Sequence, residues 1–142
     1  KLKSGNRDAV FGSTGSLCLT YLVTSSIRRA GKLAKVDLAG YSGLMLPVME
    51  DRGLAKAATD KTFNINSLLT YSAVCGVGID TVPVAGDVDI SNLALLFLDM
   101  RALSLKWQKP LSCRVMPIPG AKVDEMTAFS HPHLVNSRVM HV

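Results

Sequence analysis

The chain has 142 residues, of which 48% are hydrophobic and 19% are charged, and its formal net charge is +5. This balance is typical of one core-forming globular domain and excludes a disordered or fibrous protein. Polar residues interrupt every apolar run before it reaches the roughly 20 residues that a membrane-spanning helix needs, so we expect a soluble protein.

Three segments share one pattern: a short apolar run, a proline, a β-branched residue and then a polar or glycine-rich stretch. They are GLMLPVMED, IDTVPVAGD and CRVMPIPGAK, at residues 43–51, 79–87 and 113–122. Their prolines recur at intervals of about 35 residues, which suits one strand plus the helix that crosses back over the sheet. We therefore predict three parallel strands, with a fourth candidate strand at residues 8–11.

Helices are predicted between these strands from apolar residues spaced three and four apart and from residues that favour helix ends. Asn66 is a candidate N-cap and Gly76 a candidate C-cap of the third helix, and Asp89 or Ser91 caps the fourth. Gly31 is expected to stop the first helix. The four predicted helices cover residues 13–31, 52–60, 65–75 and 92–107.

Alternating strands and helices predict an α/β fold made of parallel βα units. The loops after the three prolines should then meet at the C-terminal edge of the sheet, where parallel α/β folds bind ligands. Three or four strands are too few to close on themselves, so the sheet edges need cover. We expect residues 1–142 to form a single α/β domain, either part of a longer protein or a unit that associates with copies of itself.

Four segments resemble a family of uncharacterised cytoplasmic proteins: GYSGLMLPVMEDRGLA, LLTYSAVCGVGIDTVPVAGDVD, KPLSCRVMPIPG and HLVNSRVM. The members of this family resemble the ten-stranded α/β barrels of pyruvate formate-lyase. The resemblance implies that the chain is the C-terminal third of such a protein, a segment of a larger barrel that lies in the cytoplasm and lacks its N-terminal part. It implies no reaction, since the family has no established catalytic residues. Glycyl-radical chemistry is not expected, because the chain lacks an adjacent cysteine pair and its segment HPHLVNSRVMHV contains no glycine.

Four carboxylates are candidate catalytic residues: Glu50, Asp51, Asp80 and Asp87. Carboxylates that meet in a partly dry cleft either bind a metal ion or separate their pKa values for acid and base roles. A divalent metal is therefore the cofactor to expect, with Glu50, Asp51 and Asp87 as its ligands. The alternative is that Glu50 and Asp51 cap the helix that follows and that Asp87 orders its own turn.

An anion-binding site is predicted at the start of the first helix, where N–H groups near Ser13, Thr14 and Gly15 can hold a phosphate or carboxylate. Lys122 and Arg138 are candidates to add positive charge. The segment lacks the lysine of a P-loop and the third glycine of a dinucleotide fingerprint. An ordinary turn with serine and threonine capping is the alternative.

The remaining candidates favour structural roles. Cys18, Cys75 and Cys113 lie far apart in apolar segments, which predicts buried thiols in a reducing compartment. His131 and His133 have no partner at a zinc-type spacing and predict a surface turn. The basic run at residues 28–35 complements the end of the first helix, and too few aromatic residues accompany it for nucleic acid to be the expected partner.

Two functions fit these patterns. The first is an enzyme that binds a small anionic substrate, with or without a divalent metal, at the rim formed by the three loops. The second is a non-catalytic structural or assembly subunit that associates through its sheet edges.

Overall fold

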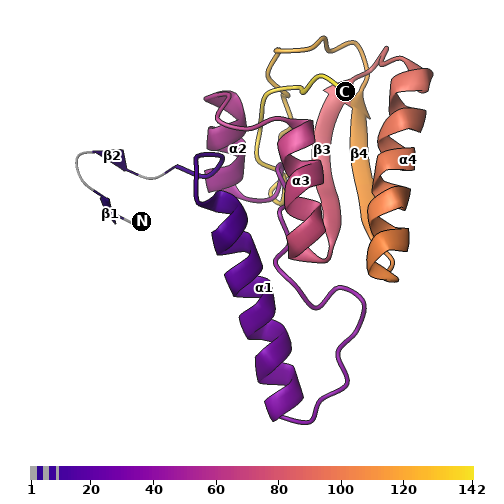
Figure 1. The fold of residues 1–142 in the computed structure, drawn as a ribbon. Helices are drawn as coiled ribbons and strands as arrows, with labels where there is room; N and C mark the ends of the chain where they lie inside the picture. The colour runs from indigo at the N-terminus through magenta and orange to yellow at the C-terminus, as the bar shows by residue number, and fades with distance from the viewer. Residues whose placement is uncertain (1–2, 5–6, 9) are drawn as a thin grey trace.

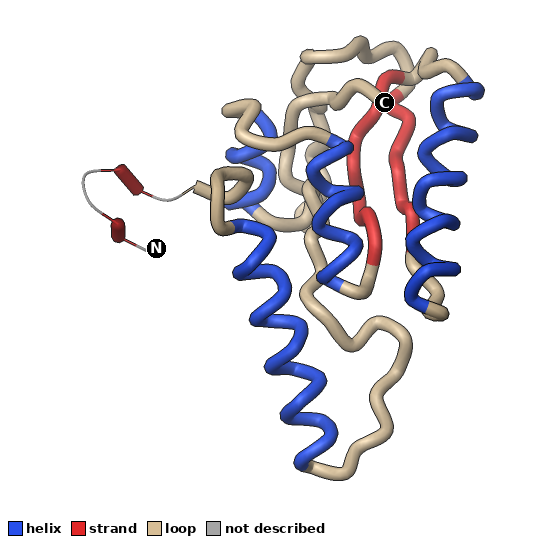
Figure 2. The backbone as a smooth tube through the Cα atoms, in the orientation of Figure 1, coloured by secondary structure: helices blue, strands red, loops and turns tan. Residues whose placement is uncertain are grey.

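The computed structural model describes residues 3–4, 7–8 and 10–142 of the chain. This part is a mixed α/β arrangement of four helices and two parallel strands, preceded by a short antiparallel strand pair (Figures 1 and 2). In chain order the elements are β1 (Lys3–Ser4), β2 (Arg7–Asp8), α1 (Ser16–Leu33), α2 (Arg52–Thr59), α3 (Ile65–Cys75), β3 (Gly78–Ala85), α4 (Ile90–Trp107) and β4 (Ser112–Ile118).

Strand β3 lies at the centre of the molecule, and all eight of its residues are buried. It pairs in parallel with β4, with Gly78 opposite Ser112. The segment around Pro47 also runs parallel to β3 and forms a bridge to Asp80. The three proline-marked segments therefore run side by side in one direction, as predicted.

Two of the predicted strands are shorter than expected or do not form. Residues 43–51 form only the bridge at Pro47, because the chain turns at once and the Glu50 N–H donates to the Pro47 carbonyl (3.1 Å). Of the candidate strand at residues 8–11, Asp8 is the last residue of the short strand β2, residue 9 lies outside the described residues, and residues 10 and 11 belong to no strand. Phe11 instead packs edge-on against Phe63 and Tyr71.

The helices lie close to their predicted positions, with two corrections at their ends. Helix α1 continues past Gly31 to Leu33, since a helix tolerates an interior glycine at a cost of about 1 kcal/mol. The N-cap of α3 is Asn64 rather than Asn66, because Asn64 and Ser67 form a reciprocal capping box. The predicted C-cap of α3 is confirmed, as Gly76 has a φ of 69°.

The core lies between β3, α2, α3 and the segments that follow Pro47 and precede the C-terminus. Helix α3 packs against both β3 and α1. The buried apolar residues include Leu46, Val48, Leu54, Ala57, Ala58, Phe63, Ile65, Leu68, Tyr71, Ile79, Val82, Val84, Leu96, Met100 and Met140.

Helices α1 and α4 leave much apolar surface outside this core. The only buried residues of α1 are Ser16, Thr20 and Thr24, and those of α4 are Leu96 and Met100. The predicted apolar face of α4 is therefore only partly covered, and its Trp107 is 56% exposed. No helix in the described part of the chain combines the length and the hydrophobicity needed to cross a membrane.

Candidate functional site

Strand β3 carries an irregularity at its third and fourth residues, Asp80 and Thr81. The register shifts there, so these two residues lie opposite a single residue of β4, Arg114. Thr81 has a φ of 48°, in the left-handed region that β-branched residues rarely adopt. Such strain costs roughly 1–3 kcal/mol and is most often found beside functional sites, where bulges also redirect side chains. The bulge is therefore a candidate location for a functional site.

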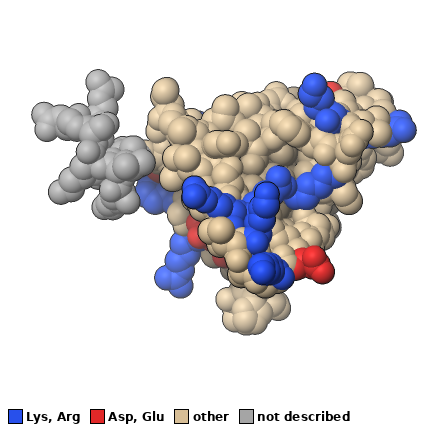
Figure 3. All heavy atoms as spheres, turned by 60° about the horizontal axis from the view of Figure 1, so that its bottom comes forward, with Lys and Arg blue, Asp and Glu red and all other residues tan. Residues whose placement is uncertain are grey.

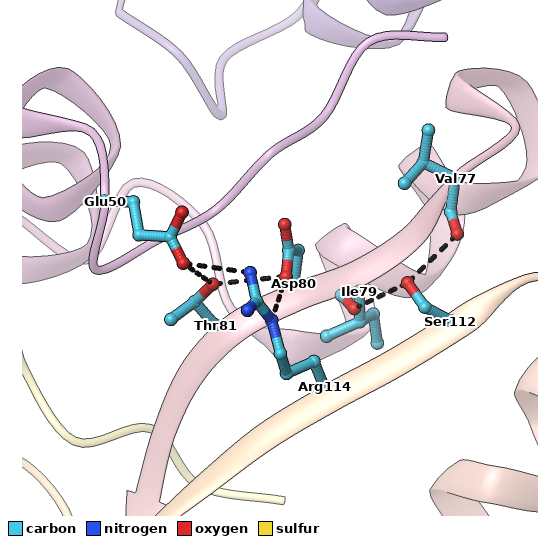
Figure 4. Close-up of polar contacts among 7 residues, drawn as sticks. All are labelled: Glu50, Val77, Ile79, Asp80, Thr81, Ser112 and Arg114. Carbon is cyan, nitrogen blue, oxygen red and sulfur yellow. Dashed lines mark hydrogen bonds and ion pairs between the residues drawn. The ribbon is translucent and has the colours of Figure 1, made fainter. Parts of the chain in front are cut away.

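Four side chains from three segments meet at this bulge (Figure 4): those of Glu50, Asp80, Thr81 and Arg114. The guanidinium of Arg114 donates from Nε to Oδ1 of Asp80 (2.5 Å) and from Nη2 to Oε1 of Glu50 (2.9 Å). The Thr81 hydroxyl lies 2.9 Å from the same Glu50 oxygen and 3.1 Å from the same Asp80 oxygen. One guanidinium and one hydroxyl thus hold two carboxyl groups from different segments together. We call these four residues the acid cluster.

Asp80 is the buried member of the acid cluster, with only 4% of its side chain exposed. Its second oxygen, Oδ2, is buried and has no hydrogen-bond partner among the described residues. An unsatisfied buried polar group costs roughly 1–3 kcal/mol, so each one in a native protein calls for a specific explanation. A ligand group that donates a hydrogen bond to Oδ2 would satisfy it.

The acid cluster is suited to hold and release a proton. Thr81 has a single hydroxyl proton for the two carboxyl oxygens beside it, so both contacts are hydrogen bonds only when one carboxyl group is protonated. The hydrogen bond to Asp80, together with the charges of Asp80 and Glu50, raises the pKa of Arg114 above its ordinary value. The guanidinium therefore stays charged beside the two carboxyl groups.

Glu50 is the member of the acid cluster that a ligand can reach. Its side chain is 38% exposed. It lines an open depression of about 730 Å³ together with the polar side chains of Arg52, His133 and Asn136. The C-terminal segment forms one wall of this depression, since the Val135 N–H donates to the backbone beside Glu50.

The structure brings together two of the four predicted catalytic carboxylates, Glu50 and Asp80. Asp51 instead caps α2 by accepting a hydrogen bond from the Leu54 N–H (2.7 Å), as the alternative interpretation held. Asp87 is exposed in the loop after β3, and no hydrogen bond among the described residues joins it to the acid cluster. Within the described ranges, no group of three or more His, Cys, Asp or Glu side chains is placed to hold a metal ion.

The register of the parallel segments explains why Asp87 does not join Glu50 and Asp80. Pro47 lies opposite Asp80, and Asp80 is five residues before Ala85, the last residue of β3. At about 3.3 Å per residue, the chain therefore leaves the sheet after Pro47 roughly 16 Å before β3 ends. The loops after β3 and β4 do meet, because the Gly86 N–H donates to the Ala121 carbonyl (3.2 Å). The predicted common rim is thus divided between two levels of the sheet.

Sequence reasoning missed Thr81 and Arg114. A signal for Arg114 was present, since Asp80 and Arg114 are the only charged residues of β3 and β4, and each is the third residue of its strand. Charged residues that face each other across buried parallel strands are expected to pair. No signal in the sequence indicated that Thr81 adopts a left-handed conformation.

The residues of the predicted anion site lie in separate surroundings. Gly15 is the N-cap of α1, with a φ of 101° and no side-chain cap, and the Ser13 hydroxyl donates to the Val10 carbonyl. Thr14 is exposed. Lys122 lies in the loop after β4, and no hydrogen bond within the described ranges links it to residues 13–15. Anion binding at this helix start stays a prediction.

Arg138 is not available to such a site, because it is 8% exposed and already paired. Its Nε donates to the Ala58 carbonyl near the end of α2, and its Nη1 donates to Asp124 (both 2.8 Å). The hydrogen bond from Lys61, and then that from Arg138, lowers the pKa of Asp124. Arg138 therefore links the C-terminal segment to α2 by a hydrogen bond.

The cysteines and histidines take no part in the acid cluster. Cys75 is buried, and burial raises the pKa of the half-buried Cys113 thiol to about 11. Cys18 is exposed, contrary to prediction, because α1 turns only a narrow polar stripe inward. His131 and His133 are exposed in a surface turn, as predicted.

These features define an α/β protein with a carboxylate–arginine cluster, built around the buried Asp80, at a bulge in its central strand. The chain belongs to the family described as Uncharacterised ACR (DUF711), whose model matches residues 7–130. It is 33% identical over 111 residues to a UPF0210 protein of Pyrobaculum aerophilum, and the matched region covers 78% of this chain and 25% of that protein. It is 31% identical over 121 residues to a UPF0210 protein of Limosilactobacillus reuteri, and the matched region covers 85% of this chain and 27% of that protein.

The chain spans about a quarter of the length of the curated relatives it matches. The family resemblance predicted from the sequence motifs is thereby confirmed, although the share of the longer proteins is a quarter and not a third. A comparison with solved structures finds no match. The pyruvate formate-lyase-like barrel stays a prediction.

Substitutions of Thr81 test whether the bulge is strained. Thr81→Ala removes the hydroxyl but keeps a side chain at a φ of 48°, whereas Thr81→Gly removes both the hydroxyl and the strain. We expect Thr81→Gly to be the more stable variant by about 1 kcal/mol in urea unfolding. At Val84, a β3 residue without a positive φ, alanine should be more stable than glycine. The same order at both positions would contradict the strain.

Proposed function

We propose that this chain supplies the proton-transferring carboxyl groups of an enzyme that acts on a small anionic substrate. One observation carries the proposal: the buried Asp80, with an unpartnered oxygen among the described residues, shares Thr81 and Arg114 with the accessible Glu50. Two carboxyl groups in different environments that are linked in this way suit general acid–base chemistry.

Each residue has a distinct role in this proposal. Glu50 is the catalytic residue, because it alone of the two carboxylates faces the open depression. A proton from a C–H or O–H bond of the substrate passes to the Glu50 carboxylate, and the electron pair of that bond stays on the substrate. Asp80, Thr81 and Arg114 are positioning residues that orient Glu50 and compensate its charge.

The depression also contains groups that suit an anionic substrate. Arg52 and His133 line it together with Glu50. A guanidinium and an imidazole can donate hydrogen bonds to a carboxylate or phosphate group, and charge-assisted hydrogen bonds of this kind are the strong ones. The substrate anion would thus be held beside the carboxylate that exchanges its proton.

Hydrogen exchange at carbon tests the proposal directly. The chain, and a chimera in which it replaces the matched segment of the Pyrobaculum aerophilum relative, are incubated in D₂O with a panel of small carboxylic and phosphorylated acids. We expect ¹H NMR to show loss of a C–H signal from at least one compound, slowed at least about a hundredfold by Glu50→Gln. Glu125→Gln, which removes the charge of the chain's other glutamate on an exposed loop, should leave the rate unchanged.

A second pair of variants separates positioning from folding in the same assay. Thr81→Ser keeps the hydroxyl between the two carboxyl groups and should retain the exchange, whereas the similarly shaped Thr81→Val should slow it. Thermal melting of each variant verifies that it is folded. The proposal is wrong if no compound shows hydrogen exchange at carbon, or if Glu50→Gln does not change the exchange rate.

The sequence-based hypothesis of a divalent ion held by Glu50, Asp51 and Asp87 is an alternative to this proposal. Within the acid cluster, Arg114 already supplies the positive charge that a metal ion would place between the carboxylates. We therefore expect calorimetric titration with MgCl₂ or MnCl₂ to show no saturable binding. If binding heat is saturable and both Glu50→Gln and Asp87→Asn abolish it, the metal hypothesis is supported. Asp60→Asn, which changes an exposed carboxylate elsewhere, is the control.

The second candidate function is a structural or assembly unit, and the uncovered apolar surface favours it. The outer edge of β4 has no strand partner among the described residues. Exposed apolar side chains extend along α4, where Ile90 is 81%, Leu98 57% and Leu105 64% exposed. Because the relatives are about four times longer, the remainder of such a chain, or further copies of this one, would cover these surfaces and extend the sheet toward the predicted barrel.

Light scattering tests this association at micromolar concentration. We expect oligomers of the isolated chain, and we expect Leu98→Glu to shift them toward monomer without lowering the melting temperature, because Leu98 is 57% exposed. Thr70→Glu, which adds the same charge at an exposed position of α3, should not change the association. A monomeric wild-type chain would rule out self-association through α4.

A further inference from the structure

A second pocket lies at the opposite end of the strands from the loops after β3 and β4, and the proposed function does not use it. It has a volume of about 190 Å³, room for on the order of six water molecules or a small organic molecule. It lies between α1, the end of α3 and the connection from α4 to β4. Its lining residues are Tyr21, Thr24, Ser25, Arg28, Ser72, Ala73, Val74, Gly76, Trp107, Lys109 and Leu111.

Two cationic side chains converge in this pocket on Gly76, the C-cap of α3. A Cβ atom at Gly76 would lie 2.6 Å from Nη2 of Arg28 and 3.0 Å from Nζ of Lys109. The ammonium of Lys109 donates to the Gly76 carbonyl. The negative end of the α3 dipole attracts both charges to this place.

The fold holds both cations there. Thr24 lies one helical turn before Arg28 on the same face of α1, and its hydroxyl donates to the Cys75 carbonyl at the end of α3 (3.0 Å). The Lys109 backbone is fixed to α4 by two hydrogen bonds, one from its N–H to the Ser104 carbonyl (3.1 Å) and one from the Ser104 hydroxyl to its own carbonyl (2.7 Å).

The positive charge of the pocket is uncompensated. No carboxylate lines it, and no ion pair within the described residues includes Arg28 or Lys109. Capping of α3 explains the position of the Lys109 side chain, which donates to the Gly76 carbonyl. The guanidinium of Arg28, by contrast, has no hydrogen bond in the described part of the chain. The pKa of Lys109 is lowered, mainly by burial and to a smaller extent by repulsion from Arg28. The nearby Cys75 has the opposite effect.

The pocket is one part of a basic end of the molecule. Figure 3 looks toward the bottom of Figure 1 and shows Lys and Arg side chains gathered there, with fewer Asp and Glu among them. Helices α1 and α4 both end on this side, with Lys32 and Lys106 in their last turns. This field would attract an anion, and the apolar walls formed by Val74, Trp107 and Leu111 would contact its uncharged part.

We propose that this pocket binds a small organic anion, whose carboxylate or phosphate group contacts Arg28 and Lys109 and whose short apolar body lies against Trp107 and Leu111. Arg28 is suited to this role because its planar guanidinium can donate two parallel hydrogen bonds to an oxyanion. The site is separate from the acid cluster, so the two proposals stand or fall independently.

The fluorescence of Trp107, the single tryptophan of the chain, reports on this pocket. The chain is titrated with inorganic phosphate, phenyl phosphate and benzoate, with sodium chloride at matched ionic strength as the reference. We expect a saturable change with phenyl phosphate or benzoate, tighter than with inorganic phosphate because the ring contacts the apolar walls. The two aromatic probes distinguish a phosphate site from a carboxylate site.

Charge-removing variants identify the residues that bind the probe. Arg28→Gln should weaken binding about tenfold or more, since it removes a charge-assisted contact. Arg29→Gln, the neighbouring exposed arginine that does not line the pocket, should leave the affinity unchanged. Glu50→Gln should also bind as the wild type does. Lys109→Gln should weaken binding, and melting curves together with the Gly76 amide signal in ¹H–¹⁵N NMR show whether the end of α3 is still folded.

Two results would overturn the proposal. One is a fluorescence change no larger than that caused by sodium chloride. The other is an equal loss of affinity in Arg28→Gln and Arg29→Gln, which would show attraction to the basic surface without a defined site.

Discussion

Burying a carboxylate in the middle of a sheet requires a partner for its charge, and β3 meets this requirement through Arg114 of β4. Asp80 is 3% exposed, and an isolated charge in such a place would be strongly destabilising. The bulge sets the strand pair so that Arg114 lies opposite Asp80 and Thr81. The same guanidinium then reaches Glu50 on the neighbouring segment. One ion pair therefore determines where the accessible carboxylate lies and why the backbone of Thr81 is held in a strained conformation.

The two proposed sites have opposite charge character because of the way in which parallel βα units are built. Helices α3 and α4 end where β3 and β4 begin, so their negative dipole ends lie on one side of the molecule. Arg28, Lys106 and Lys109 are found on that side. The acid cluster instead lies where the chain leaves the Pro47 segment and turns into α2. The net charge of +5 is thus unevenly distributed, and the basic end provides a field in which an anion can bind without any contact to the acid cluster.

The apolar surface that remains outside the core agrees with the length of the relatives. Helix α1 turns small polar residues toward α3, and α4 buries only Leu96 and Met100, so neither helix covers its apolar residues within this chain. Strand β4 is half-buried and has one strand neighbour among the described residues. A chain that spans about a quarter of its relatives' length would show such faces if the remaining three quarters pack against them.

The sequence by itself determined the helices, most of their caps and the parallel direction of the proline-marked segments. It also grouped Glu50 with Asp80, together with two carboxylates, Asp51 and Asp87, that do not join them. These features follow from local periodicity, from capping side chains such as that of Asp89, and from the short connections of βα units. Only the tertiary structure decided the register, which sets Pro47 opposite Asp80 and thereby separates Asp87 from Glu50, and the local contact by which Asp51 caps α2. It also decided the bulge that adds Thr81 and Arg114, and the packing of α1 on α3 that brings Arg28 to Lys109. Register and helix packing depend on contacts between residues far apart in the chain, and a local pattern carries no information about which of those contacts form.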